Sequence, residues 1–195
     1  DERQTARREL LDGLNTMGAT MGDSAAVAAA EQAKDQAYEL ILGRGKEVFN
    51  LGKESTKTRD MFGRHTFGQE CLAARRMVEA GVPYIAINYP GGWDTHKNHF
   101  DTMKRQCPEL DQGLAALIQD LHDHGLLDST IVWWSGEFGR TPMYQGKGGA
   151  GRDHHIKGFS MWLAGGGVKG GITYGATDDL GYNAVENVTS MHDLH

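Results

Sequence analysis

The stretch VPYIAINYPGGWDTHKNHF, residues 82–100, joins an apolar run to a polar loop, and this junction decides the fold. Residues 82–89 are mostly apolar and rich in β-branched side chains, which is typical of a strand covered on both faces of a sheet. The two glycines that follow allow a sharp turn. The stretch therefore predicts a buried strand that ends in a loop carrying Asp94, His96 and His99.

The residues after this loop predict a helix and then a second strand. Pro108 suits the first position of a helix, and Gly125 suits the position after its end. The strand is STIVWWS, residues 129–135, and a further apolar run, FSMWLAGGG, spans residues 159–167. A strand, a crossover helix and a strand within about fifty residues form a βαβ unit with parallel strands. We therefore expect an α/β fold with a mainly parallel sheet between helices.

Two polar loops directly follow the predicted strands. Parallel strands present such loops at one edge of a sheet, where α/β folds bind ligands. The first loop carries Asp94 and His96, and the second, GEFGRTP, carries Glu137. We therefore expect these three side chains at one edge of the sheet.

A third polar cluster, GRDHH at residues 151–155, precedes a strand instead of following one. Asp153 and His154 can reach the same edge only if strand 159–164 runs antiparallel to strand 130–135. A single site built from all three clusters therefore predicts an antiparallel strand 159–164.

Carboxylates and imidazoles from several loops suit Zn²⁺, Mn²⁺ or a mixed pair of divalent ions. Such an ion polarises a phosphoryl or sulfuryl oxygen and activates water for ester hydrolysis. Arg140 and Arg152 lie beside the candidate ligands, and a guanidinium binds a tetrahedral oxyanion through paired hydrogen bonds. The pattern favours metal-assisted ester hydrolysis.

Simpler interpretations of the same residues stay open. Asp94 followed by Thr95 also suits an Asx-turn, in which the carboxylate bonds to its own backbone. Glu137 also suits an ion pair with Arg140, and GRDHH also suits a solvated loop. Trp93 favours loop packing over ligand binding.

Length and composition exclude several classes of protein. The chain has 195 residues, which suits one domain, and its formal net charge of −6 without a basic block argues against nucleic acid as a partner. It contains no apolar run of about eighteen residues, so we expect no membrane span. Cys71 and Cys107 have no CxxC spacing and indicate no thiolate zinc site.

The organisation along the chain predicts two parts. Residues 1–60 favour a helical segment packed on the domain, with Asp23 or Ser24 as the cap of an alanine-rich helix that ends near Gly43. Residues 61–195 carry the strands and all the candidate chemistry.

From about residue 36 to residue 195 the chain resembles the domain of unknown function 1501 (DUF1501) family of bacterial proteins. The motifs GGWDTH, GEFGRTP and GRDHH carry the resemblance, in this order. The family is assigned to the alkaline phosphatase and sulfatase-like superfamily, which implies that residues 61–195 form the C-terminal half of a sulfatase-like α/β domain. The superfamily strand that supplies a nucleophile has no counterpart before residue 80, so the resemblance implies an incomplete member.

The resemblance also implies roles for individual residues. Asp94 and His96 resemble an early metal-binding pair of the superfamily, and His154 resembles a later histidine ligand. Glu137 and Phe138 stand where the superfamily has a metal-binding Asp-His pair, so Phe138 removes one ligand.

Two functions follow as expectations. The first is a metal-dependent hydrolase of sulfate or phosphate esters, acting on a small-molecule or glycan ester. Its divalent metal would be zinc, calcium or manganese, and Arg140 or Arg152 would steady the oxyanion. The metal ligands would be Asp94, His96, Glu137, Asp153 and His154, with Asp153 either a ligand or an orienting partner.

The alternative is a non-catalytic ligand- or glycan-binding protein that keeps the fold, and Phe138 favours it. The resemblance implies an extracytoplasmic location for either. A separation of roughly 3–7 Å between the carboxylate and imidazole groups would favour the metal site.

Overall fold

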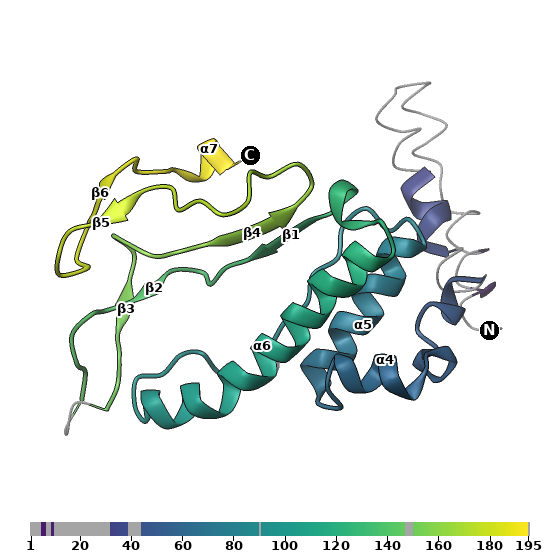
Figure 1. Cartoon of the computed structure of the whole chain (residues 1–195), viewed down its shortest axis with the longest axis horizontal. Coiled ribbons are helices and arrows are strands. Elements are labelled where there is room, and N and C mark those ends of the chain that lie inside the picture. The colour runs from purple at the N-terminus through teal and green to yellow at the C-terminus, as the bar shows by residue number, and fades with distance from the viewer. Residues whose placement is uncertain are drawn as a thin grey trace.

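The protein has mixed α and β structure, with α4 and α5 at one end and the short strands, together with α7, at the other (Figure 1). The computed structural model describes residues 5–6, 9, 32–38, 44–89, 91–146 and 150–194. The helices are η1 (Arg44–Glu47), η2 (Leu51–Lys53), α4 (Thr56–Met61), α5 (Thr66–Glu79), α6 (His99–Asp123), η3 (Leu127–Ser129) and α7 (Met191–Leu194). The strands are β1 (Ile131–Trp134), β2 (Gly139–Arg140), β3 (His154–His155), β4 (Trp162–Gly165), β5 (Ala176–Thr177) and β6 (Ala184–Glu186).

The hydrophobic core lies where α5 packs against α6. A Cβ atom on Gly113 of α6 would lie 2.9 Å from the ring of Phe67 on α5, so the absence of a side chain lets the two helices approach closely. Gly81, with φ +83, ends α5 in the left-handed conformation. The buried cluster comprises Phe62, Phe67, Cys71, Leu72, Ala116, Leu117 and Leu121.

Helix α6 connects this core to the polar loop that precedes it. The helix begins at His99, after Asn98 in the left-handed conformation, so the prediction that it starts at Pro108 is wrong. Pro108 lies inside the helix, where it cannot donate a backbone hydrogen bond. Figure 1 shows α6 changing direction along its length, as an internal proline predicts.

Residues 82–89 form no strand, in contrast to the sequence prediction. Their apolar side chains do pack, since Ile87 and Tyr89 lie against the buried cluster. A strand also requires a hydrogen-bonded neighbour, and no segment of the described residues pairs with this one. All three strand pairs of the described residues are antiparallel, so the predicted mainly parallel sheet is absent from this part of the chain.

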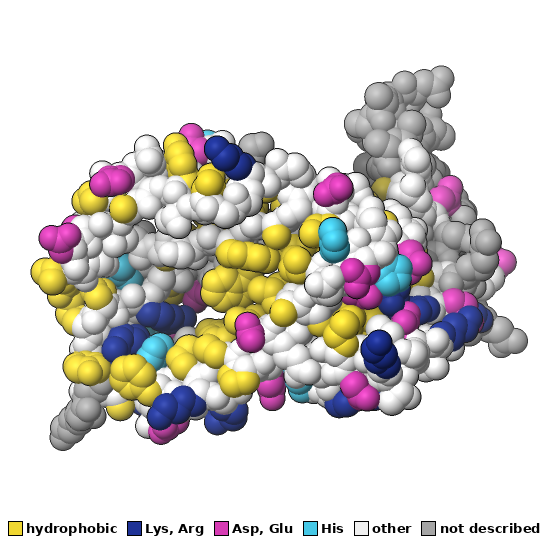
Figure 2. All heavy atoms as spheres, in the orientation of Figure 1, with side chains coloured by type: hydrophobic (Ala, Val, Ile, Leu, Met, Phe, Trp, Pro, Cys, Tyr) yellow, Lys and Arg dark blue, Asp and Glu magenta, His cyan; other side chains and the backbone are white. Residues whose placement is uncertain are grey.

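The predicted antiparallel arrangement of strand 159–164 is confirmed. Strand β4 pairs antiparallel with β1, and Ile131 lies opposite Gly165. Strand β1 is only partly buried: Val132 packs against the core, while Trp133 is 44% exposed. Figure 2 shows hydrophobic side chains gathered at the surface over the β1–β4 region.

The described residues of the N-terminal part are mainly helical and are tied to α5. Residues 32–38 are helical, and the rest of the predicted alanine-rich helix lies outside the described residues. Arg75 of α5 is only 3% exposed, and its guanidinium lies 2.8 Å from Glu54 and 2.7 Å from each of Glu79 and Asp120. This buried ion-pair cluster joins residues before α4 to both core helices.

Across the described residues, no helix combines the length and hydropathy needed to cross a lipid bilayer.

Candidate metal centre

The loop that carries Asp94 is anchored to the core by a row of aromatic rings. The centroid of Tyr89 lies 5.0 Å from the ring of Phe67 on α5 and 5.0 Å from the ring of Trp93. Such tilted ring pairs stabilise packing beyond their buried area. Trp93 thus packs in the loop, as its sequence context favoured. Because Trp93 directly precedes Asp94, this packing anchors the chain next to Asp94.

A β-hairpin supplies the other side of the site. Strands β2 and β3 pair antiparallel, which places Arg140 directly opposite His154. The pairing continues away from these strands, because the backbone nitrogen of Thr141 donates to Asp153 and Gln145 pairs with Gly151. The hairpin therefore holds its side chains on a hydrogen-bonded backbone.

The loop and the hairpin touch through their backbones. The nitrogen of Arg152 donates to the carbonyl of Thr95 at 2.9 Å, and the nitrogen of His99 donates to the carbonyl of Ala150 at 2.7 Å. A Cβ atom on Gly151 would lie 2.0 Å from the carbonyl oxygen of His96, so only glycine permits this approach. These contacts fix His96 close to the hairpin.

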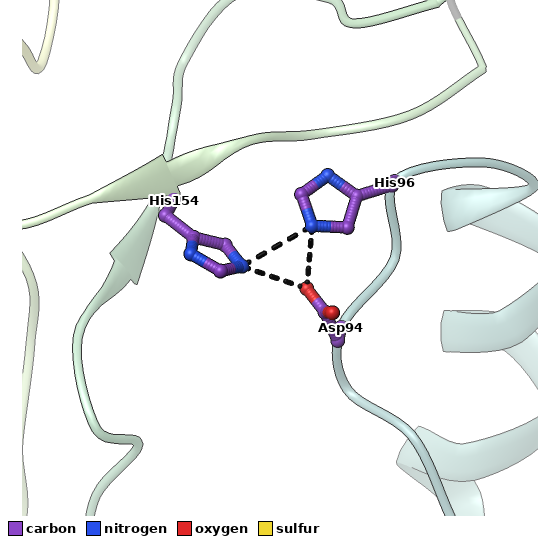
Figure 3. A group of neighbouring side chains, drawn as sticks. All are labelled: Asp94, His96 and His154. Atoms are coloured by element: carbon purple, nitrogen blue, oxygen red, sulfur yellow. Dashed lines mark hydrogen bonds and ion pairs between the residues drawn. The ribbon is translucent and has the colours of Figure 1, made fainter.

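Three side chains converge where the loop meets the hairpin: Asp94 and His96 from the loop, and His154 from β3 (Figure 3). Oδ1 of Asp94 lies 2.9 Å from Nε2 of His96 and 3.0 Å from Nε2 of His154. The two Nε2 atoms are 3.2 Å apart. We call this group the Asp-His-His triad; its side chains are 40–57% exposed, so solvent and small molecules can reach it.

The contacts of His96 suit a proton on Nδ1. Oε1 of Gln145 lies 2.6 Å from Nδ1 of His96, and an amide oxygen accepts a hydrogen bond. With the proton on Nδ1, the lone pair of Nε2 in a neutral ring faces the carboxylate oxygen of Asp94, 2.9 Å away. A metal cation bound by both atoms would use this arrangement.

The donor set fits a small divalent ion. Tetrahedral zinc, with bonds of about 2.0–2.1 Å, separates its ligand atoms by about 3.3 Å. The three donor atoms of the triad, separated by 2.9–3.2 Å, are close to this spacing. Asp153 Oδ1 lies 3.8 Å from Nδ1 of His96, on the opposite side of the ring from the triad. Asp153 and Gln145 thus stand where residues that orient a metal-binding histidine are found.

Arg140 lies against the triad and links Glu137 to it. Its Nη1 donates to Oδ1 of Asp94 at 2.6 Å, and its Nη2 donates to Oε1 of Glu137 at 3.2 Å. Glu137 therefore forms an ion pair with Arg140, which was one of the two roles the sequence suggested. Glu137 is not among the three converging donors. Asp94 bonds to these side chains and forms no Asx-turn among the described hydrogen bonds.

The electrostatic surroundings keep Asp94 charged. The hydrogen bond from His154, together with the bond from Arg140 and the charges of His96 and Arg140, holds the pKa of Asp94 below its ordinary value of 3.8. These effects outweigh the opposing effect of desolvation. The carboxylate is therefore available as an anionic ligand even in mildly acidic solution.

Arg152 is placed differently from Arg140. Its guanidinium carbon lies 4.6 Å from the ring centroid of Tyr144 and 5.2 Å from that of Phe100. Its Nη1 donates to the carbonyl of Gly151. Arg152 is therefore held between two aromatic rings by cation–π attraction, and the structure gives it no contact with the triad.

Two flanking residues shape the triad. The ring centroid of Phe138 lies 4.4 Å from that of His154, so Phe138 packs against a triad member. Nδ1 of His99 lies 2.6 Å from Oγ1 of Thr95, and His99 is not among the three converging donors. Burial, followed by the charges of Arg152 and Arg140, lowers the pKa of His99.

Sequence reasoning missed Gln145 and the role of Gly151. Gln145 has no motif around it, and only the hairpin register brings it to His96, from which it is 49 residues distant. The glycine of GRDHH gave a signal, since glycine is the usual residue where two backbones approach closely.

The family model described as "Protein of unknown function (DUF1501)" matches residues 1–195. No curated protein and no solved structure matches the chain.

Proposed function

The chain belongs to the DUF1501 family, and from its own residues we propose that it is a metal-dependent hydrolase of sulfate or phosphate esters. We include in this proposal its membership of the alkaline phosphatase and sulfatase-like superfamily. The observation that supports it best is the Asp-His-His triad with Arg140 bonded to its carboxylate.

The proposed metal ligands are Oδ1 of Asp94, Nε2 of His96 and Nε2 of His154. Two imidazoles and one carboxylate are a ligand set of catalytic zinc sites, which leave a coordination position open. Calcium prefers six to eight oxygen ligands, so we propose zinc or manganese ahead of calcium. When bound, the ion supplies Lewis acidity, which polarises the ester group and activates water.

Arg140 is the proposed partner of the substrate oxyanion. A guanidinium presents several donors in one plane, so Arg140 can keep one bond to Asp94 while it turns another toward a tetrahedral sulfate or phosphate. Glu137, which accepts from Nη2, orients this guanidinium and limits its movement. We assign Arg152 no contact with the reacting group.

The proposed reaction adds water across the ester bond. The oxygen of water forms a bond to sulfur or phosphorus, the bond to the alcohol oxygen breaks, and a proton goes to the alcohol. Within the described residues, no Ser, Thr or Cys side chain has a hydrogen bond to the triad. We therefore propose direct attack by water and no covalent intermediate on these residues.

The test is metal analysis of the purified protein together with an ester-hydrolysis screen using 4-nitrophenyl sulfate and 4-nitrophenyl phosphate. We expect about one equivalent of zinc or manganese, and loss of both metal and activity in His96→Ala and His154→Ala. His122→Ala is a matched control, because His122 lies on the exposed end of α6. A protein that takes up no divalent ion, or variants that hydrolyse the esters as well as the wild type, would refute the proposal.

A non-catalytic binding protein is the second candidate. Phe138 packs on His154 where the superfamily resemblance implies a further ligand, and no Ser, Thr or Cys side chain of the described residues has a hydrogen bond to the triad. Metal bound by the triad, combined with no hydrolysis of either ester, would favour this candidate.

A further inference from the structure

A second feature adjoins the triad: an open groove of about 610 Å³ lined by His154, His155, Ile156, Lys157, Tyr182 and Asn183. His154 belongs both to this groove and to the triad, so the two features are adjacent.

The walls of the groove come from β3 and from the hairpin of β5 and β6. Figure 1 shows these elements at the same end of the molecule. The backbone nitrogen of Ala184 in β6 donates to the carbonyl of Lys157 at 2.8 Å, which fixes one wall against the other. A Cβ atom on Gly158 would lie 3.1 Å from Cγ2 of Thr177 in β5, so the two walls are also in close contact below the groove.

The turn that carries Tyr182 and Asn183 is held by Asp178. Its carboxylate accepts from the backbone nitrogen of Tyr182 at 2.8 Å, and from the backbone and side-chain nitrogens of Asn183 at 3.0 and 2.9 Å. The backbone nitrogen of Asp178 donates in return to the carbonyl of Asn183. The turn is therefore ordered before any ligand binds, which reduces the entropy lost on binding.

The chemistry of the lining suits an anion that also carries hydroxyl groups. Lys157 is the only residue of the six with a permanent charge, and no carboxylate is among them. Tyr182 and Asn183 add a phenol and an amide, which pair with hydroxyl groups. Nε2 of His155 is buried without a hydrogen-bond partner among the described residues, so one polar atom of the lining is unsatisfied.

We propose that this groove binds a sugar that carries a sulfate or phosphate ester: the sugar, which does not react, lies in the groove, and the ester group lies at its His154 end. The inference rests on the proposed hydrolase function, because the shared His154 places the ester at the triad. Lys157 pairs with the anionic group, while Tyr182 and Asn183 contact the sugar ring.

The test separates binding in the groove from chemistry at the triad. Glucose, glucose 6-sulfate, glucose 6-phosphate and inorganic sulfate are titrated by NMR into metal-free His96→Ala protein and into chelator-treated wild type. The chelator-treated wild type keeps the test valid if His96→Ala folds poorly. We expect one or both sugar esters to bind at least about tenfold more tightly than glucose and inorganic sulfate. The preferred ester identifies the anion.

Lys157→Ala should weaken binding of that ester by at least about tenfold, whereas Lys169→Ala, an exposed lysine outside the groove, should leave it unchanged. Equal binding of the ester by wild type and Lys157→Ala, or equal losses in both variants, would overturn the inference. The inference would also be overturned if glucose bound as tightly as its esters, or if inorganic sulfate bound as tightly as glucose 6-sulfate. Failure of the hydrolase proposal can be told apart from failure of this inference. In the first case the protein would bind no metal and hydrolyse no ester but would still bind the sugar ester.

Discussion

The side-chain oxygen of Gln145 lies 2.6 Å from Nδ1 of His96, and this bond leaves Nε2 of His96 free to face Asp94 and His154. Residues that orient a metal-binding histidine typically contribute ten- to hundredfold to metal affinity. We therefore predict that Gln145→Ala weakens zinc binding by about 10- to 100-fold, measured by competition with a chelator.

The control for this prediction is Gln119→Ala, which removes an exposed glutamine that bonds to Asp123 on α6. Equal zinc affinities of wild type and Gln145→Ala would show that the Gln145 bond does not orient His96.

Gly151 tests whether the contact between the loop and the hairpin matters. In Gly151→Ala the new methyl group would overlap the carbonyl oxygen of His96, 2.0 Å away, and the loop would have to move. We predict a loss of roughly 1–3 kcal/mol in the free energy of unfolding, together with weaker metal binding. Denaturant titration and metal competition measure the two effects.

Gly170→Ala is the matched control, because a Cβ atom there meets nothing within 4 Å. If the two alanine variants had the same stability and metal affinity, the close approach at Gly151 would be unimportant.

The two arginines named from the sequence should behave differently. Arg140 bonds to Asp94 and Glu137, whereas Arg152 lies between Tyr144 and Phe100. Because removal of one group that stabilises a developing charge typically costs about 10²–10³ in rate, we predict such a loss of kcat/KM for Arg140→Ala. For Arg152→Ala we predict a smaller loss of rate and a lower melting temperature. Steady-state hydrolysis of 4-nitrophenyl esters measures kcat/KM of both variants. A larger loss of kcat/KM for Arg152→Ala than for Arg140→Ala would contradict the proposal that Arg140 contacts the oxyanion.

Arg75 should be important for stability. It is 3% exposed and lies within 2.8 Å of Glu54, Glu79 and Asp120. Removing Arg75 takes the arginine partner from the buried carboxylate of Asp120, whereas Glu54 keeps Arg76, and loss of one partner of a buried ion pair costs about 3–5 kcal/mol. We predict a loss of this size for Arg75→Ala in denaturant titrations.

Arg64→Ala, which removes an exposed ion pair with Asp60, should cost about 1 kcal/mol or less. Similar losses for the two variants would mean that the buried cluster contributes no more than a surface pair.

His99 should make stability depend on pH. Burial and the charges of Arg152 and Arg140 lower its pKa below the ordinary value of 6.5, so the unfolded chain binds a proton more readily than the folded protein. The resulting stabilisation is present above pH 6.5 and is lost as the pH falls through the lowered pKa of the folded state. We predict that metal-free wild type loses more stability between neutral and mildly acidic pH than His99→Gln, which cannot titrate. Parallel losses in the two proteins would contradict this.

Part of the site arrangement could be predicted from the sequence, because a single site required the loops that carry Asp94 and His154 to lie together. The antiparallel direction of β4 was required to bring His154 to the loop of Asp94, and β1 and β4 do pair in this way. The ligand roles themselves stay predictions. The sequence could not decide whether Glu137 is a metal ligand or an ion-pair partner of Arg140. The two residues are three positions apart, and this spacing suits either role.

The errors in the fold have physical causes. Residues 82–89 have the composition of a strand, but composition does not supply the hydrogen-bonded neighbour that a strand needs. Pro108 suits a helix start, yet a proline is tolerated inside a long helix whose other turns are well packed, as in α6. The Gln145 contact arises from hairpin register, which no local pattern encodes.

Asp94 and His154, which meet at 3.0 Å, are 60 residues apart along the chain. An ion held by both would act as a reversible cross-link between the loop that precedes α6 and the β2–β3 hairpin. In the chain-entropy description, closing a loop of this length restricts the unfolded chain by roughly 4 kcal/mol. Metal uptake would therefore fasten the strand-rich end of the molecule to its helical core, and the two ends would then unfold as one cooperative unit.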